Sequence, residues 1–80
     1  KKSEYTHVVQ SHQVSLYRFA LNFLGSSEDA RDIVQDVFVK LWLNVDRIDQ
    51  DKVKSWLFTC THHAMLNFIK RRARIDYMQS

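Results

Sequence analysis

The sequence contains no proline, one glycine and one cysteine among its 80 residues. With so few of the residues that mark tight turns, helices joined by short loops are favoured over a turn-rich β fold. A single cysteine excludes an intrachain disulfide and is typical of a reducing, cytoplasmic location. No signal peptide is visible and no apolar run reaches the length of a membrane span, so we expect no membrane insertion.

What the sequence does contain is apolar and aromatic. The hydrophobic content is 45%, with five Phe, two Trp and three Tyr. This composition supports a core in a chain short enough to form one small domain, a size at which burial is marginal. Because Lys1 stands where an initiator methionine would, we expect the chain to be part of a longer protein.

Three segments show helical spacing of their apolar residues. The first spans residues 5–24 and has a second apolar stripe at Val14, Tyr17 and Leu21, and Gly25 is suited to end it. The second begins at Ser26, which can cap it near Asp29. Its expected core residues are Ala30, Ile33, Val34, Val37, Phe38, Leu41, Trp42 and Val45.

The third helix is expected over residues 53–74, with Asp51 as its N-cap and a frayed exit beyond it. Its predicted core face consists of Leu57, Phe58, Thr61, Ala64, Met65, Phe68 and Ile69. The first helix contributes Tyr5, Val8, Val9, His12, Leu16, Phe19, Ala20, Phe23 and Leu24. The predicted fold is therefore all-α, a compact three-helix bundle, with room for one short helical turn between residues 44 and 52.

Charge is distributed unevenly although the net charge is only +3. Residues 28–46 hold five carboxylates against two cations, whereas the last third holds five cations against Asp76. Such asymmetry suggests two surfaces with different partners, one of them a polyanion. Ordinary scatter of solvated charge remains the alternative.

The second helix has a face opposite its core stripe. At about 100° per residue, this face carries Asp32, Gln35, Asp36, Val39 and Leu43. An apolar centre with a polar rim is typical of a docking surface. The alternative is that Val39 and Leu43 pack inside the domain, because a middle helix touches two neighbours.

The third helix has an acid-free face away from its core. This face carries Trp56, Thr59, His63, Asn67, Lys70 and Arg74. Aromatic rings can stack on unpaired bases, small polar groups can reach base edges, and cations pair with phosphate. The alternative is a solvated face whose terminal cations complement the helix dipole.

Taken in order, "EDARDIVQDVFVKLW" and "WLFTCTHHAMLNFIKRRAR" resemble region 2 of bacterial extracytoplasmic-function sigma factors. The family pattern is an acidic "D-x-x-Q-[DE]-x-F-x-x-x-W" helix followed by a "W-L" helix that ends in arginines. The matching residues are Asp32, Gln35, Asp36, Phe38, Trp42, Trp56, Leu57 and Lys70 to Arg72. The resemblance covers essentially the whole chain.

The resemblance implies a role in transcription initiation. It implies that Asp32, Gln35, Asp36 and Val39 bind the β′ clamp helices of core RNA polymerase. It also implies that the loop and the third helix recognise and melt the promoter minus-ten element by holding the non-template strand, with one base flipped into a pocket near residues 44–55. The DNA-binding residues implied are Lys54, Ser55, Trp56, Thr59, His62, His63, Asn67, Lys70, Arg71 and Arg74.

Two departures from the family pattern affect these expectations. His63 stands in place of the usual Asn and Asn67 in place of the usual Asp, so the family's base preference is not carried over to this chain. Region 4, which reads the upstream promoter element, is absent from the chain. We therefore expect a region 2 domain over residues 1–75 and the start of an interdomain linker over 76–80. An anti-sigma factor is a further partner that the resemblance implies.

Catalytic and metal functions are not supported by the residue pattern. Cys60, His62 and His63 form the one metal-like cluster, but a structural zinc site needs four ligands. Cys60 and His63 lack a third orienting group, and no glycine-rich loop is present. We expect no enzyme activity, no cofactor and no metal. The rival functions are a helical protein-interaction domain without nucleic-acid binding, and a double-strand DNA reader, for which a short glycine-containing turn is missing.

Overall fold

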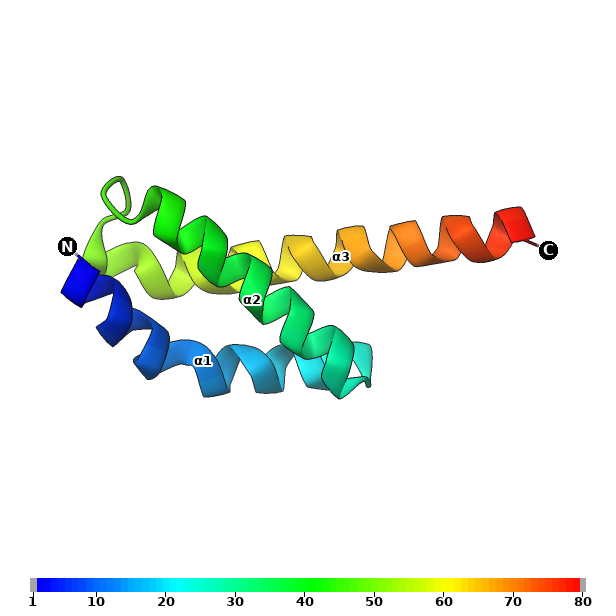
Figure 1. Cartoon of the computed structure of the whole chain (residues 1–80), viewed down its shortest axis with the longest axis horizontal. Coiled ribbons are helices and arrows are strands. Elements are labelled where there is room, and N and C mark those ends of the chain that lie inside the picture. The colour runs from blue at the N-terminus through cyan, green and yellow to red at the C-terminus, as the bar shows by residue number, and fades with distance from the viewer. Residues whose placement is uncertain (1, 80) are drawn as a thin grey trace.

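The computed structural model describes the backbone of residues 2–79 and the side chains of residues 4–74. Within that range the chain forms three α-helices and one short 3₁₀ turn: α1 (Lys2–Leu24), α2 (Ser27–Asn44), η1 (Gln50–Lys52) and α3 (Val53–Gln79). α1 and α2 form an antiparallel pair, and α3 packs against both and projects beyond them (Figure 1). The predicted three-helix, all-α fold is confirmed, with its extra turn at η1.

The turn between α1 and α2 forms as the sequence predicted. Gly25 has a φ of +72°, in the left-handed region where a side chain is strained, and its N–H donates to the Leu21 carbonyl at 2.8 Å. Ser26 then adopts an extended conformation, and its hydroxyl accepts a hydrogen bond from the Asp29 N–H at 3.3 Å. A left-handed glycine followed by a serine cap reverses the chain within two residues.

The entry to α3 differs from the prediction. Asp51 was expected to cap α3, but it lies inside η1, which is preceded by Asp49 in an extended conformation. The Lys52 N–H donates to the Asp49 carbonyl at 2.9 Å, so a 3₁₀ turn leads directly into α3. The frayed exit expected after residue 74 was also wrong, because α3 continues to Gln79. In the part of the chain that is described, no helix is both long and apolar enough to cross a membrane.

The core lies where the three helices meet. Its buried apolar residues are Val8, Leu16 and Ala20 of α1, Ala30, Ile33, Val34, Val37, Phe38 and Leu41 of α2, and Leu57 and Met65 of α3. Thr61 is fully buried as well, and its hydroxyl donates to the Leu57 carbonyl at 2.7 Å, which satisfies its polar group. α2 supplies about half of the core because it lies between the other two helices.

Three predicted core residues are exposed instead. Phe23 and Ile69 are 46% and 40% exposed, because both lie at the end of the bundle that α3 runs past. Trp42 is 42% exposed, but its ring makes an edge-to-face contact with that of Tyr5 of α1, with ring centroids 4.9 Å apart. The Tyr5 hydroxyl also donates to the Phe38 carbonyl at 3.1 Å, so Tyr5 ties the start of α1 to the second half of α2.

Candidate functional site

The α2 outer face, defined as Asp32, Gln35, Asp36, Val39 and Leu43, is exposed throughout. Val39 is 56% exposed and Leu43 is 72% exposed, whereas Val37 and Leu41 on the other side of the same helix are fully buried. The alternative that Val39 and Leu43 pack inside the domain is therefore wrong. Two aliphatic side chains remain in solvent among two carboxylates and an amide, as a docking surface requires.

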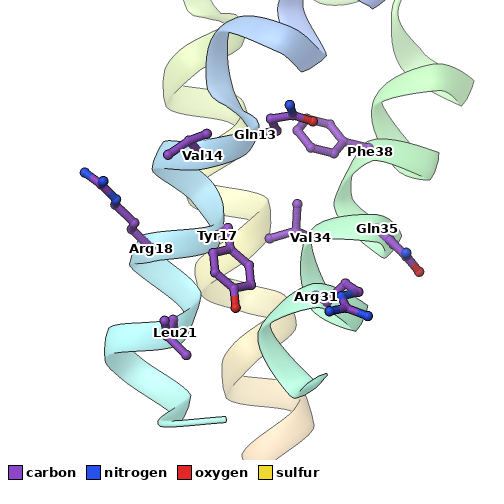
Figure 2. Close-up of a pocket in the computed structure, with 9 residues that line it drawn as sticks. All are labelled: Gln13, Val14, Tyr17, Arg18, Leu21, Arg31, Val34, Gln35 and Phe38. Atoms are coloured by element: carbon purple, nitrogen blue, oxygen red, sulfur yellow. The ribbon is translucent and has the colours of Figure 1, made fainter. Parts of the chain in front are cut away.

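An apolar groove of about 540 Å³, which we call the α1–α2 groove, flanks this face on the α1 side. Its walls are Val14, Tyr17 and Leu21 from α1 and Val34 and Phe38 from α2. Figure 2 shows Tyr17, Val34 and Phe38 between the two helices. The second apolar stripe predicted on the first helix is what lines it.

The rim of the groove is polar, consisting of Gln13, Arg18, Arg31 and Gln35. Arg18 and Arg31 come from facing helices, and no carboxylate is among the lining residues (Figure 2). Gln35 belongs to both the groove and the α2 outer face, so the two surfaces are continuous.

Most residues of the predicted acid-free face of α3 are exposed to solvent, but Trp56 is not fully exposed. Thr59, His63, Asn67, Lys70 and Arg74 are exposed, as are Lys54 and Ser55 at the start of the helix and Arg71 near its end. Trp56 is half-buried and packs against the core. His62 is exposed as well, and its ring lies 6.3 Å from that of Phe23 of α1 and 6.3 Å from that of His63, so it lies between α1 and the face that carries His63.

A second concavity, of about 390 Å³, lies where the loop meets α3. We call it the loop pocket, and it is lined by Asn44, Arg47, Ile48, Asp49, Lys52 and Trp56. Trp56 is thus a wall of the pocket as well as a core contact. Arg47 and Lys52 were not singled out from the sequence, although two cations within an acidic loop were a usable signal.

A smaller cleft of about 130 Å³ separates α2 from α3. We call it the α2–α3 cleft, and it is lined by Ile33, Asp36, Lys40, Ala64, Asn67, Phe68 and Arg71. It brings Asp36 of the α2 outer face to the same place as Asn67 and Arg71 of α3. The two predicted surfaces therefore meet along this seam.

Cys60 of α3 is half-buried and lies within reach of the charge of Lys40, which lines the α2–α3 cleft. Burial raises the pKa of its thiol, and the positive charge of Lys40 offsets part of that increase. Among the residues whose side chains are described, no three His, Cys, Asp or Glu side chains come together in a way that could hold a metal ion.

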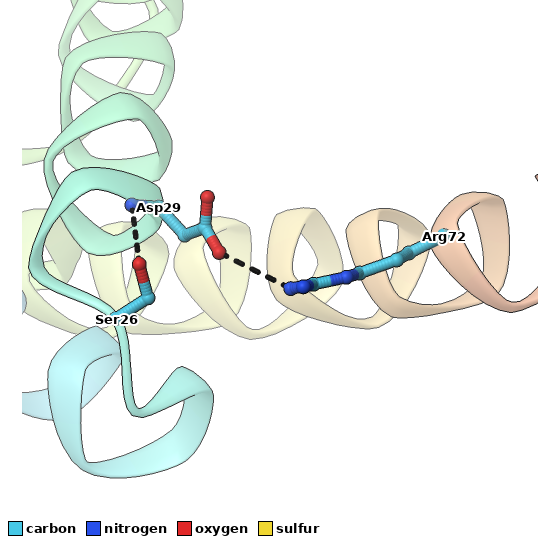
Figure 3. Close-up of polar contacts among 3 residues, drawn as sticks. All are labelled: Ser26, Asp29 and Arg72. Atoms are coloured by element: carbon cyan, nitrogen blue, oxygen red, sulfur yellow. Dashed lines mark hydrogen bonds and ion pairs between the residues drawn. The ribbon is translucent and has the colours of Figure 1, made fainter.

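The cations of the basic run on α3, residues 70–74, differ in their surroundings. The Arg72 guanidinium lies 3.4 Å from the Asp29 carboxylate, next to the Ser26 cap at the start of α2 (Figure 3). This contact directs Arg72 toward the bundle. Lys70, Arg71 and Arg74, the members of the run predicted to bind DNA, are exposed.

A family model described as sigma-70 region 2 matches residues 8–75. The chain belongs to the sigma-70 region 2 family. The resemblance expected from "EDARDIVQDVFVKLW" and the third helix is therefore confirmed, and the matched range extends from the first buried residue of α1 nearly to the end of α3.

Curated relatives of this region 2 domain are sigma factors. It is 25% identical over 67 residues to the ECF RNA polymerase sigma factor SigM of Bacillus subtilis, covering 84% of the chain and 41% of the relative. It is 29% identical over 68 residues to the ECF RNA polymerase sigma factor SigE of Mycolicibacterium smegmatis, covering 85% and 26%. It is 40% identical over 52 residues to the RNA polymerase sigma factor NccH of Alcaligenes xylosoxydans xylosoxydans, covering 64% and 28%.

The region 2 domain spans between about a quarter and two-fifths of the length of these relatives. No solved structure matches the chain.

Proposed function

We propose that this region 2 domain acts in transcription initiation by docking on core RNA polymerase and capturing promoter DNA. The observation that carries the proposal is the division of the family motif into two exposed surfaces. The α2 outer face keeps Val39 and Leu43 in solvent, and the acid-free face of α3 lies beside the loop pocket. One domain thus offers an acidic docking surface and, adjoining it, a cationic and partly aromatic surface.

For the first surface, we propose that Asp32, Gln35 and Asp36 make polar contacts with the β′ clamp helices and that Val39 makes an apolar contact. Carboxylates at the rim favour a basic partner surface, and buried aliphatic side chains at the centre supply most of the affinity. An anti-sigma factor that covers the same face is a further proposed partner. This role places the domain in the cytoplasm.

For the second surface, we propose that the non-template strand of the minus-ten element lies along α3. A flipped base enters the loop pocket, where the Trp56 ring forms one wall and Arg47, Asp49 and Lys52 offer polar contacts. The strand contacts the exposed residues along α3: Lys54, Ser55, Thr59, His63 and Asn67. Its phosphates pair with the cations Lys70, Arg71 and Arg74. His62 is the member of the proposed set nearest to α1, since its ring lies 6.3 Å from that of Phe23 as well as 6.3 Å from that of His63.

The test is binding of a labelled single-stranded oligonucleotide, followed by fluorescence anisotropy over a range of salt concentrations. The binding is measured for the chain alone and for its complex with core polymerase, so that weak binding by the free domain still leaves a signal. Lys70→Ala and Arg71→Ala should each lower the affinity. The slope of log K against log salt is negative, and its magnitude should decrease by about 0.7 for each phosphate that is no longer paired with a cation.

Arg18→Ala is the control, because Arg18 is an exposed cation in the α1–α2 groove, away from α3. If the Lys70 and Arg71 variants bind DNA as the Arg18 variant does, the domain does not hold DNA through α3. The rival function, a helical protein-interaction domain without nucleic-acid binding, would then be the better account.

A further inference from the structure

Lys40 belongs to neither of the two proposed surfaces, yet it lies between them. It is exposed on α2 and lines the α2–α3 cleft together with Asp36 of its own helix and Asn67 and Arg71 of α3. Its charge also acts on Cys60 of α3. Lys40 is therefore a cation that α2 contributes to the side of the domain where α3 carries its proposed DNA contacts.

The polar atoms around the cleft suit one phosphodiester group. Lys40 and Arg71 can each donate to a phosphate oxygen, and the Asn67 amide can donate as well. Asp36 adds one negative charge, so the cleft has two cations and one carboxylate. Its floor of Ile33, Ala64 and Phe68 is apolar, which lowers the local dielectric and strengthens contacts at the rim.

The cleft is also in line with the loop pocket. Asn44 lines that pocket and follows Lys40 by one helical turn, and its side-chain amide donates to the Lys40 carbonyl at 2.8 Å. On α3, Trp56 lines the pocket and Asn67 lines the cleft, about 16 Å further along at a rise of about 1.5 Å per residue. A strand that enters the loop pocket and follows α3 passes the cleft.

We propose that Lys40, together with Arg71, binds a backbone phosphate of the captured DNA strand in the α2–α3 cleft, and that Asp36 opposes this binding by its charge. The proposal rests on the proposed function, since it adds a contact from α2 to the strand assigned to α3. It also gives Asp36 two effects of opposite sign, favourable for polymerase docking and unfavourable for DNA binding.

The experiment compares Lys40→Gln with Arg31→Gln. Both residues are exposed cations on α2, but Arg31 lies in the α1–α2 groove. Removing one cation–phosphate pair should lower the magnitude of the slope of log K against log salt by about 0.7 for single-stranded DNA. Over the roughly tenfold range from about 1 M to about 0.1 M salt, the variant should therefore gain about fivefold less affinity than the unsubstituted domain. Arg31→Gln should change neither quantity, and circular dichroism should show unchanged helicity in both.

Asp36→Asn tests the sign of the effect. Removing a negative charge near the phosphate should strengthen DNA binding, by no more than about fivefold, which is the effect of one unit charge at 4 Å in water. A purely structural role for Asp36 would weaken binding instead. If the free domain binds too weakly, Lys40→Gln and Arg31→Gln are compared as saturated complexes with core polymerase.

The outcomes separate this proposal from the proposed function. If Lys70→Ala and Arg71→Ala weaken DNA binding but Lys40→Gln behaves as Arg31→Gln does, the cleft site is refuted and the proposed function stands. If Lys40→Gln weakens polymerase pull-down and leaves DNA binding unchanged, Lys40 belongs to the docking surface and the proposal fails. If no α3 variant affects DNA binding, both proposals fail together.

Discussion

Two pairs of residues on α2 allow a matched test of the docking surface. Val39 and Leu43 are 56% and 72% exposed, whereas Val37 and Leu41 are fully buried. Both pairs consist of a valine and a leucine one helical turn apart. The double variants Val39→Ala/Leu43→Ala and Val37→Ala/Leu41→Ala therefore make the same chemical change on the same helix, at sites that differ in burial.

The expected stability effects differ several-fold. Leu41→Ala should cost about 2–5 kcal/mol, as expected for a fully buried leucine, and the valine adds to it. A domain of this size has a free energy of unfolding of roughly 4–12 kcal/mol, so the buried pair should bring it close to unfolding. Leu43 hides only about a quarter of its surface, so its truncation should cost roughly 0.5–1 kcal/mol. Val39→Ala should offset part of the stability lost at Leu43, because the helix propensity of alanine is higher than that of valine by roughly 0.5 kcal/mol.

The assays are urea unfolding followed by circular dichroism, and capture of core RNA polymerase by the immobilised domain. The exposed double variant should keep its unfolding midpoint and bind polymerase at least tenfold more weakly, since central apolar side chains cost more than about 1 kcal/mol each when truncated. Ile69→Ala is the binding control, because Ile69 is a 40% exposed aliphatic residue on α3.

Two results would refute the reasoning. If the exposed pair destabilises the domain as much as the buried pair does, Val39 and Leu43 belong to the core in solution. If the exposed double variant binds polymerase as Ile69→Ala does, the α2 outer face is solvated surface and docking occurs elsewhere.

The remaining predictions concern the Ser26 cap and the Cys60 thiol. Ser26→Ala removes the acceptor for the Asp29 N–H and should lower the free energy of unfolding by about 1 kcal/mol. An unchanged urea midpoint would mean that water replaces the cap at no cost. Burial raises the pKa of Cys60, so iodoacetamide at pH 8 should alkylate the folded chain more slowly than the urea-unfolded chain. The same shift implies stability that is present below the unfolded-state pKa of Cys60 and lost as the pH rises through its higher folded-state pKa. A free energy of unfolding that does not fall over this rise in pH would contradict the shift. Lys40→Gln should slow the alkylation further, because the positive charge of Lys40 lowers the pKa of Cys60.

Local rules in the sequence predicted most of the architecture. The spacing of Ala30 to Leu41 identified the core stripe of α2, and Gly25 with Ser26 marked the turn, because left-handed backbone and helix capping each depend on one residue type. The family motif also lies in local sequence, so the resemblance to sigma factor region 2 was visible without the fold. The entry to α3 was less predictable, since Asp46, Asp49 and Asp51 are all chemically able to cap a helix.

The tertiary structure decided which apolar residues are buried and which charged residues meet. A helical wheel shows that Val39 and Leu43 share a face, but only the positions of α1 and α3 show that neither helix covers it. In the same way, Phe23 and Ile69 have core spacing but lie where α3 runs past the bundle. The meeting of Asp36, Lys40 and Arg71 in one cleft depends on how α2 packs beside α3, and no pattern within a single helix encodes that packing.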